Sequence, residues 1–203
     1  MPEMNGFEYE IVESMFDDGL GKSCILKNYD GPEGDILDIP SYINGIPVRY
    51  IDSYFWIYVR SENEIRFPET LITPSCSGTE KYVEIDLGFS EEVRTISVNK
   101  DNKWLFAEEG VLYIRGQENS KLNSILYRYP TGKPGKEFSV AEGCTTIFRH
   151  AFENVCEIEK INLGSVKEIG ESAFEDCKNL KYIKLNNVEL IKYHAFSYCK
   201  SIK

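Results

Sequence analysis

The last third of this chain repeats with a fixed step of 22 residues. An isoleucine begins each step, an Ala-Phe pair follows four residues later, and a small apolar residue completes the pattern: Ile147, Ile169 and Ile191; Ala151-Phe152, Ala173-Phe174 and Ala195-Phe196; Val155, Cys177 and Cys199. A period of this size is typical of a solenoid, in which one repeat cannot bury its apolar face alone and stacks on its neighbours. The period predicts an α/β repeat solenoid.

Each 22-residue unit predicts one strand and one turn. Ile161-Asn162-Leu163 and Ile183-Lys184-Leu185 alternate apolar and polar residues, as a strand with one buried face does. We expect these strands to pair in parallel, about 4.8 Å apart. The segment around Ala173-Phe174 lacks β-branched residues and predicts a short helical turn. We expect Phe152, Phe174 and Phe196 to stack inside a right-handed coil.

The stretch IGESAFEDCKNLKYIKL resembles the BspA-like leucine-rich repeat, which is found largely in bacterial surface proteins and some protist ones. YDGPEGDILDIPSYINGIPVRYID is similar to that family's first coil, and NKDNKWLFAEEGVLYI with LNSILYRYPTGKPGKEFSVAEG resembles its inserted hairpin. The resemblance covers roughly residues 24–203, although Phe55-Trp56 replaces Ala-Phe and residues 57–82 match poorly. It implies a right-handed leucine-rich-repeat coil with parallel strands, short helical turns and an inserted hairpin.

The sequence divides into four parts. Residues 1–35 are expected to form an N-terminal capping hairpin, since an end coil otherwise exposes apolar side chains and free strand-edge groups. Residues 36–98 are expected to form irregular first coils, residues 99–137 an inserted hairpin segment, and residues 138–203 the regular repeats. The chain as given stops just before the strand of its last repeat, which predicts an uncovered end at Phe196, Tyr198 and Ile202.

Composition and charge limit the classes of partner that the chain can bind. Hydrophobic residues make up 42% of the chain, which favours a folded protein, and no run of about 18 apolar residues predicts membrane insertion. The net charge is −10, and residues 1–143 carry 14 Lys and Arg against 25 Asp and Glu. An acidic body disfavours nucleic acid. No signal peptide is present in the chain as given, and the compartment stays open because members of the family are often secreted or at the cell surface.

No catalytic motif stands out, and we expect no enzyme activity, no catalytic residues, no metal and no cofactor. G-x-S-x-G, P-loop and H-E-x-x-H patterns are absent from the sequence. His150 and His194 share a repeat position but lie two coils apart, about 10 Å by strand spacing, which is too far for one metal ion. The six cysteines show no zinc spacing, and Cys177 and Cys199 stand at an apolar repeat position. We expect all six to be thiols.

The outward side chains of successive strands are expected to form one continuous face, which repeat proteins often use for binding. The weak binding candidates on this face are Arg66, Asp86, Asn162, Lys160, Tyr182 and Lys184. Tyr182 and Arg66 are favoured among them, because binding hot spots are enriched in Tyr and Arg. The alternative is a solvated polar face without a partner.

Two functions follow. By family resemblance, the chain is a non-catalytic protein-binding module in adhesion or cell-surface recognition, with a protein partner. Alternatively, it is a structural or assembly module, which self-associates or docks another domain through its open C-terminal coil.

Overall fold

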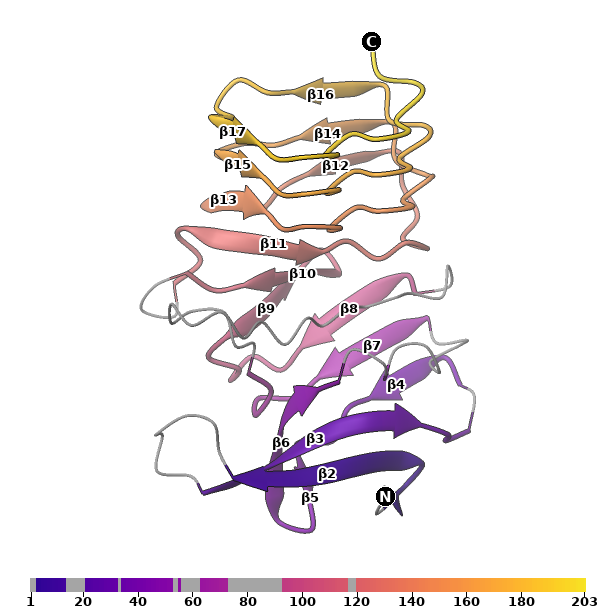
Figure 1. The fold of residues 1–203 in the computed structure, drawn as a ribbon, viewed down its shortest axis with the longest axis vertical. Helices are drawn as coiled ribbons and strands as arrows, with labels where there is room; N and C mark the ends of the chain where they lie inside the picture. Colours follow the sequence, from indigo (N-terminus) through magenta and orange to yellow (C-terminus); the bar gives the residue numbers. More distant parts are fainter. Residues whose placement is uncertain are drawn as a thin grey trace.

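The computed structural model describes residues 3–13, 21–32, 34–52, 55, 63–72, 93–116 and 120–203. The strands are stacked along the long axis of the molecule, from the N-terminal to the C-terminal end (Figure 1). In chain order they are β1 (Glu3–Met4), β2 (Phe7–Glu13), β3 (Lys22–Tyr29), β4 (Ile36–Asp38), β5 (Tyr42–Ile43), β6 (Ile46–Ile51), β7 (Glu64–Phe67), β8 (Thr95–Val98), β9 (Leu105–Glu108), β10 (Val111–Ile114), β11 (Ser124–Arg128), β12 (Glu137–Ser139), β13 (Cys144–Ile147), β14 (Lys160–Asn162), β15 (Glu168–Ile169), β16 (Tyr182–Lys184) and β17 (Leu190–Ile191). No helix in the described ranges is long and apolar enough to cross a membrane.

Two parallel sheets run through the C-terminal coils. One is β12-β14-β16, and the other continues β11 through β13, β15 and β17. Ile161 lies opposite Ile183 in the first sheet, which confirms the parallel pairing predicted at this step. Ile147, Ile169 and Ile191 lie opposite one another in the second sheet. Each coil therefore contributes two short strands rather than the single strand that the sequence predicted.

An aromatic ladder fills the space inside the coils. The ring centroids of Phe152 and Phe174 are 4.8 Å apart, and those of Phe174 and Phe196 are 5.1 Å apart with an interplanar angle of 1°. Phe152 and Phe174 are fully buried, and Phe196 is half-buried at the end of the ladder. The predicted stack is confirmed. Tyr129 extends it by one ring, 4.9 Å from Phe152.

The short helical turns predicted after the second strand are wrong. The segments are turns, and in each coil two residues have a left-handed backbone on either side of the Ala-Phe pair. These residues are His150 and Asn154 (φ 55° and 60°), Ser172 and Asp176 (51° and 56°), and His194 and Tyr198 (56° and 59°). A right-handed helix cannot continue through such a residue. Only three residues remain between each pair, fewer than one helical turn.

The N-terminal half has a different strand arrangement. β2 and β3 pair antiparallel as the hairpin expected in this region, and β3 pairs in parallel with β6. Together with β1 and β5 they form a five-stranded sheet, while β4, β7 and β8 form a separate parallel sheet. Residues 14–20, between β2 and β3, lie outside the described residues.

The hairpin expected within residues 99–137 joins a larger sheet. β9 and β10 pair antiparallel around Glu109 and Gly110, both of which have positive φ, as a two-residue hairpin turn requires. β10 then pairs with β11, and β11 pairs in parallel with β13. Phe148 packs against the two hydrophobic clusters formed by the described residues, so the N-terminal and C-terminal halves share a continuous core.

Candidate functional site

The outward face of β12, β14 and β16, here called the strand face, brings four of the six predicted binding residues together. In register, Glu137 lies beside Lys160 and Lys160 beside Tyr182; Ser139 lies beside Asn162 and Asn162 beside Lys184. The residues between them turn inward, since side chains alternate along a strand. The two-residue period therefore places Lys160, Asn162, Tyr182 and Lys184 on one surface, as the sequence predicted.

The strand face is a shallow depression of about 290 Å³. Lys160 Nζ lies 3.1 Å from Glu137 Oε2, so this lysine is paired. Lys184 has no ion pair in the described part of the chain, and Tyr182 is 55% exposed. The far end of the face therefore offers one free cation beside one aromatic ring.

A ladder of charges runs beside the strand face. The carboxylate of Glu159 lies 2.7 Å from Lys136 Nζ and 2.6 Å from Lys181 Nζ. The hydrogen bonds from Lys136 and then Lys181 lower the pKa of Glu159 to about 2. Two lysines share this one carboxylate, so the ladder keeps one net positive charge beside the free cation of Lys184.

Arg66 and Asp86 do not join the strand face. Arg66 lies on β7 in the separate β4-β7-β8 sheet, where its guanidinium donates two hydrogen bonds to Glu64, at 3.0 and 3.2 Å. Ser97 donates a third to the same carboxylate, at 2.8 Å. The hydrogen bonds from Arg66 lower the pKa of Glu64. Asp86 lies outside the described residues.

The single continuous face expected from the sequence is therefore interrupted. β4-β7-β8 and β12-β14-β16 are two sheets with no hydrogen-bonded ladder between them in the described residues (Figure 1). The hairpin of β9 and β10 belongs to the other sheet, so no described strand bridges the gap. This leaves the strand face as the surface that gathers most of the predicted residues.

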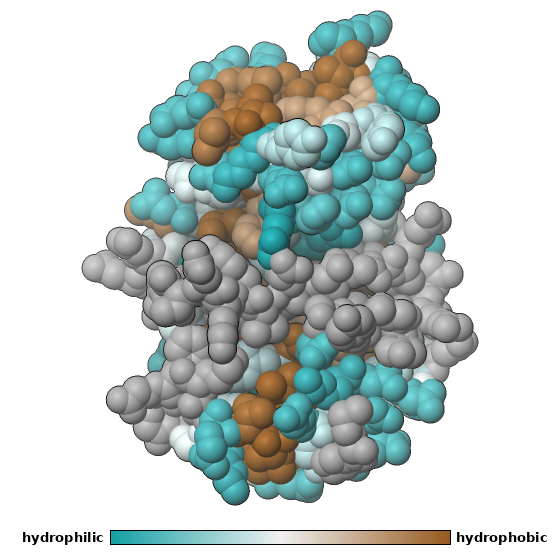
Figure 2. All heavy atoms as spheres, in the orientation of Figure 1, coloured by the Kyte–Doolittle hydropathy of each residue, from teal (hydrophilic) through white to brown (hydrophobic). Residues whose placement is uncertain are grey.

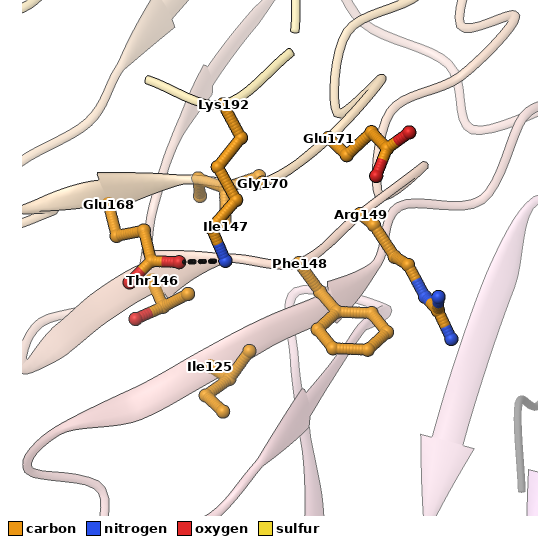
Figure 3. A pocket seen from close by; sticks show the side chains of 9 residues that line it. All are labelled: Ile125, Thr146, Ile147, Phe148, Arg149, Glu168, Gly170, Glu171 and Lys192. Carbon is orange, nitrogen blue, oxygen red and sulfur yellow. Dashed lines mark ion pairs between the residues drawn. The ribbon is translucent and has the colours of Figure 1, made fainter. Parts of the chain in front are cut away.

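A groove of about 410 Å³ lies over the sheet of β11, β13 and β15, and the sequence analysis did not predict it. Figure 3 shows Ile125 and Phe148 on one side of it, with the ion pair of Lys192 and Glu168 (2.6 Å) across one end. Phe148, Gly170 and Lys192 share one repeat position. A side chain at Gly170 would meet the backbone of Arg149 at 2.6 Å, so the glycine lets the two coils approach closely. That change from Phe to Gly is the signal that sequence reasoning missed.

One group in the described residues has the composition of a metal site. His150, Glu153 and Glu175 each offer a ligand atom, and these atoms all lie within 4.8 Å of one another. His194, the other histidine, faces Ser197 instead, with Nδ1 2.7 Å from Oγ.

Cys144 and Cys177 are buried in the repeat core and Cys199 is half-buried there, whereas Cys24 is buried in the N-terminal hydrophobic cluster. Cys177 Sγ donates to the carbonyl of Phe152 at 3.0 Å, and Cys199 Sγ donates to the carbonyl of Phe174 at 2.9 Å. Burial raises the pKa of Cys144 to about 11 and also raises the pKa of Cys24. A raised pKa keeps such a thiol protonated and unreactive at neutral pH. Cys76 lies outside the described residues.

The last coil exposes side chains that the preceding coil buries. Leu163 is 2% exposed and its counterpart Leu185 is 39% exposed; Ile169 is fully buried and its counterpart Ile191 is 44% exposed. Figure 2 shows a hydrophobic patch at the C-terminal end of the molecule. β16 and β17 are also the edge strands of their sheets, so both leave backbone groups unpaired along one side.

Comparison with known proteins identifies the repeat. Residues 132–203 match the BspA type leucine rich repeat region in six copies. None of the curated proteins matches the chain.

Solved structures give the fold. A leucine-rich repeat protein from Eubacterium ventriosum is 20% identical, with a TM-score of 0.51 over 82% of this chain and 47% of that one. A leucine rich cell surface protein from Faecalibacterium prausnitzii is 14% identical, with a TM-score of 0.38 over 100% of this chain and 93% of that one. The likeness to the first shows a repeat fold, and this chain spans about half the length of that protein.

Proposed function

We propose that the chain is a non-catalytic protein-binding module for adhesion or recognition at a cell surface, because residues 132–203 match the BspA type leucine rich repeat region. A leucine-rich repeat family implies a protein-interaction or surface-recognition module. In this proposal, the stacked coils form one right-handed solenoid, and its outer strands carry the binding residues. Its N-terminal hairpin covers one end, and the β9-β10 hairpin lies between coils.

The observation that carries the proposal is the composition of the strand face. Lys160, Asn162, Tyr182 and Lys184 share this face, and the free cation of Lys184 lies in the same depression as the exposed ring of Tyr182. Tyrosine side chains are enriched in binding hot spots because they offer contact area at low entropic cost. Rigid strands hold these groups in place before a partner arrives, which lowers the cost of binding.

The charge of the strand face indicates which chemical groups a protein partner should present to it. Glu137 and Lys160 neutralise each other, and Lys184 leaves one positive charge. We therefore expect the partner to offer an acidic segment to Lys184 and an apolar or planar group to Tyr182. Complementary charge of this kind sets orientation and association rate more than affinity.

The experiment compares two double variants for binding to intact cells and to immobilised extracellular proteins. Tyr182→Ala with Lys184→Glu alters the strand face, while Tyr193→Ala with Lys200→Glu changes the same residue types elsewhere on the last coils. We expect binding to fall about 10-fold or more with the first variant and to stay unchanged with the second. Equal binding by both variants would rule out the strand face.

The second candidate function is assembly through the open C-terminal coil, and the exposed Leu185 and Ile191 favour it. The occupant that we propose is a second copy of the chain, joined end to end about a two-fold axis. Such an axis would place each edge strand antiparallel to its copy and hide the same apolar side chains on both sides. Charge repulsion would not oppose this dimer, because residues 144–203 carry 9 Lys and Arg against 8 Asp and Glu. The strongly acidic residues 1–143 of the two copies would lie away from the interface.

Light scattering over a range of concentrations tests assembly. Ile191→Lys should give a monomer, whereas Ile11→Lys changes an equally exposed isoleucine (43% against 44%) on a strand at the other end and should leave the dimer intact. A wild-type protein that stays monomeric at every concentration, with rapid amide exchange in residues 191–203, would show that the last coil frays instead.

A further inference from the structure

We infer that His150, Glu153 and Glu175 form a binding site for one divalent transition-metal ion of the zinc class. The site goes beyond protein binding and lies on the turns of the coils rather than on the strand face. The sequence predicted no metal because it tested His150 only against His194. The structure shows that the relevant neighbours are carboxylates, one from the same turn and one from the next coil.

The backbone fixes the positions of the three residues. His150 and Glu153 belong to one turn, and Glu175 occupies the position of Glu153 one repeat later. Hydrogen bonds join the two turns at alternate residues: His150 N to Glu171 O (3.1 Å), Phe152 N to Ala173 O (2.7 Å) and Asn154 N to Glu175 O (2.9 Å). The turns are therefore clamped together, and the side chains that leave them start from set points. Sites on such supported backbone hold a ligand geometry better than a free loop does.

The distances fit one small ion. Zinc binds histidine nitrogen and carboxylate oxygen at about 2.0–2.2 Å, so two neighbouring ligands lie roughly 3–3.5 Å apart. His150 Nδ1 and Glu153 Oε2 are 3.0 Å apart. All three ligand atoms lie within 4.8 Å of one another, so rotation of a half-buried glutamate side chain is enough to close the set.

Two features of the group formed by His150, Glu153 and Glu175 favour binding of a cation. His150 Nδ1 is withdrawn from solvent, and its 3.0 Å approach to Glu153 Oε2 lacks the geometry of a hydrogen bond. The carboxylate of Glu175 has no ion pair in the same part of the chain and lies next to that of Glu153, so two like charges are held together while half-buried. Partly desolvated like charges repel strongly, and a divalent ion would offset that repulsion.

The donor set selects the class of ion. One imidazole nitrogen with two carboxylate oxygens suits Zn²⁺ and its neighbours in the transition series, whereas Ca²⁺ and Mg²⁺ prefer oxygen ligands alone. Three protein ligands leave room for water in the fourth position of a tetrahedral zinc site.

The full-length protein, freed of metal with a chelator and kept reduced, can be titrated with Zn²⁺ by calorimetry. We expect one equivalent to bind, and His150→Gln and Glu175→Gln each to weaken binding at least ~10-fold. His194→Gln is the matched control. His194 occupies the repeat position of His150, but its neighbour three residues later is Ser197 and not a glutamate, so this variant should leave the affinity for Zn²⁺ unchanged. Circular dichroism checks that each variant is folded.

Titration with Co²⁺ separates this site from the thiols and needs no variant. Ligation by nitrogen and oxygen gives visible d–d absorption without the intense near-ultraviolet band of a thiolate-to-cobalt transition. Co²⁺ absorption with that thiolate band, the absence of binding, or equal affinity for Zn²⁺ in His150→Gln and wild type would each overturn the assignment.

Discussion

At the scale of single residues, the 22-residue register predicts which side chains are buried in the core, but it does not predict which turn residues have a left-handed backbone. Phe152, Phe174 and Phe196 stack as their spacing required. Tyr129 was missed because it stands 23 residues before Phe152 rather than 22, after a register shift in β11 between Ser124 and Ile125. The left-handed turn residues could not be predicted from type alone, since the same position holds His150, Ser172 and His194.

Phe174 should be a costly ring of the ladder to remove. It is fully buried with a phenylalanine ring on each side, at 4.8 and 5.1 Å. Phe174→Ala should lower the free energy of unfolding by ~3–5 kcal/mol in urea denaturation, because it loses buried contacts and leaves a cavity. Phe196→Ala should cost less, since its ring is half-buried and has a ring neighbour on one side. A loss under ~1 kcal/mol for Phe174→Ala would contradict the buried ladder.

The cysteines should all be thiols. Cys177 and Cys199 direct their sulfur atoms toward the carbonyls of Phe152 and Phe174, as small buried side chains do in a repeat core. Counting thiols in denaturant without reductant should find all six of the chain's cysteines. Detection of two fewer would reveal a bridge and point to an oxidising compartment.

At the scale of elements, the strands of the regular repeats follow from the sequence, and the turns between them do not. Alternation around Ile161 and Ile183 predicts the inward and outward side chains correctly. β15 and β17 are only two residues long, which is too short to produce an alternation that a reader could detect. The ion pairs that join neighbouring coils, such as Glu159 with Lys181, depend on this register and also escaped prediction.

Glu159 should make stability depend on pH at the acid end. Hydrogen bonds from Lys136 and Lys181 lower its folded-state pKa to about 2, whereas an unfolded glutamate titrates near 4.3. The stabilisation is therefore present above about pH 4.5 and is lost as pH falls toward 2. Glu159→Gln should remove this contribution, so its urea midpoint should approach that of wild type between pH 5 and pH 2.

Added salt should weaken the same effect, because these charges are partly exposed and are screened. Wild-type and Glu159→Gln curves that run parallel across this pH range would show that the ladder does not stabilise the coils.

At the scale of the whole molecule, the sequence predicted the repeat fold correctly, but the single continuous binding face that it also predicted is interrupted. The alternation of Ile65 and Ile96 resembles that of Ile161 and Ile183, yet the corresponding strands lie in two separate sheets. The sequence between them is irregular, and spacing alone does not reveal where a sheet stops. We therefore propose recognition through β12, β14 and β16, where Tyr182 and Lys184 are accessible.

The most direct test of that assignment places a photo-activated cross-linking residue at position 182 in one protein and at position 193 in another. Tyr182 and Tyr193 are both exposed tyrosines, at 55% and 73%, but Tyr182 lies on the strand face and Tyr193 follows the edge strand of the other sheet. With a mixture of extracellular proteins, we expect a discrete adduct with another protein at position 182 and none at position 193. Adducts at position 193 alone, or only between copies of this chain, would contradict recognition through the strand face.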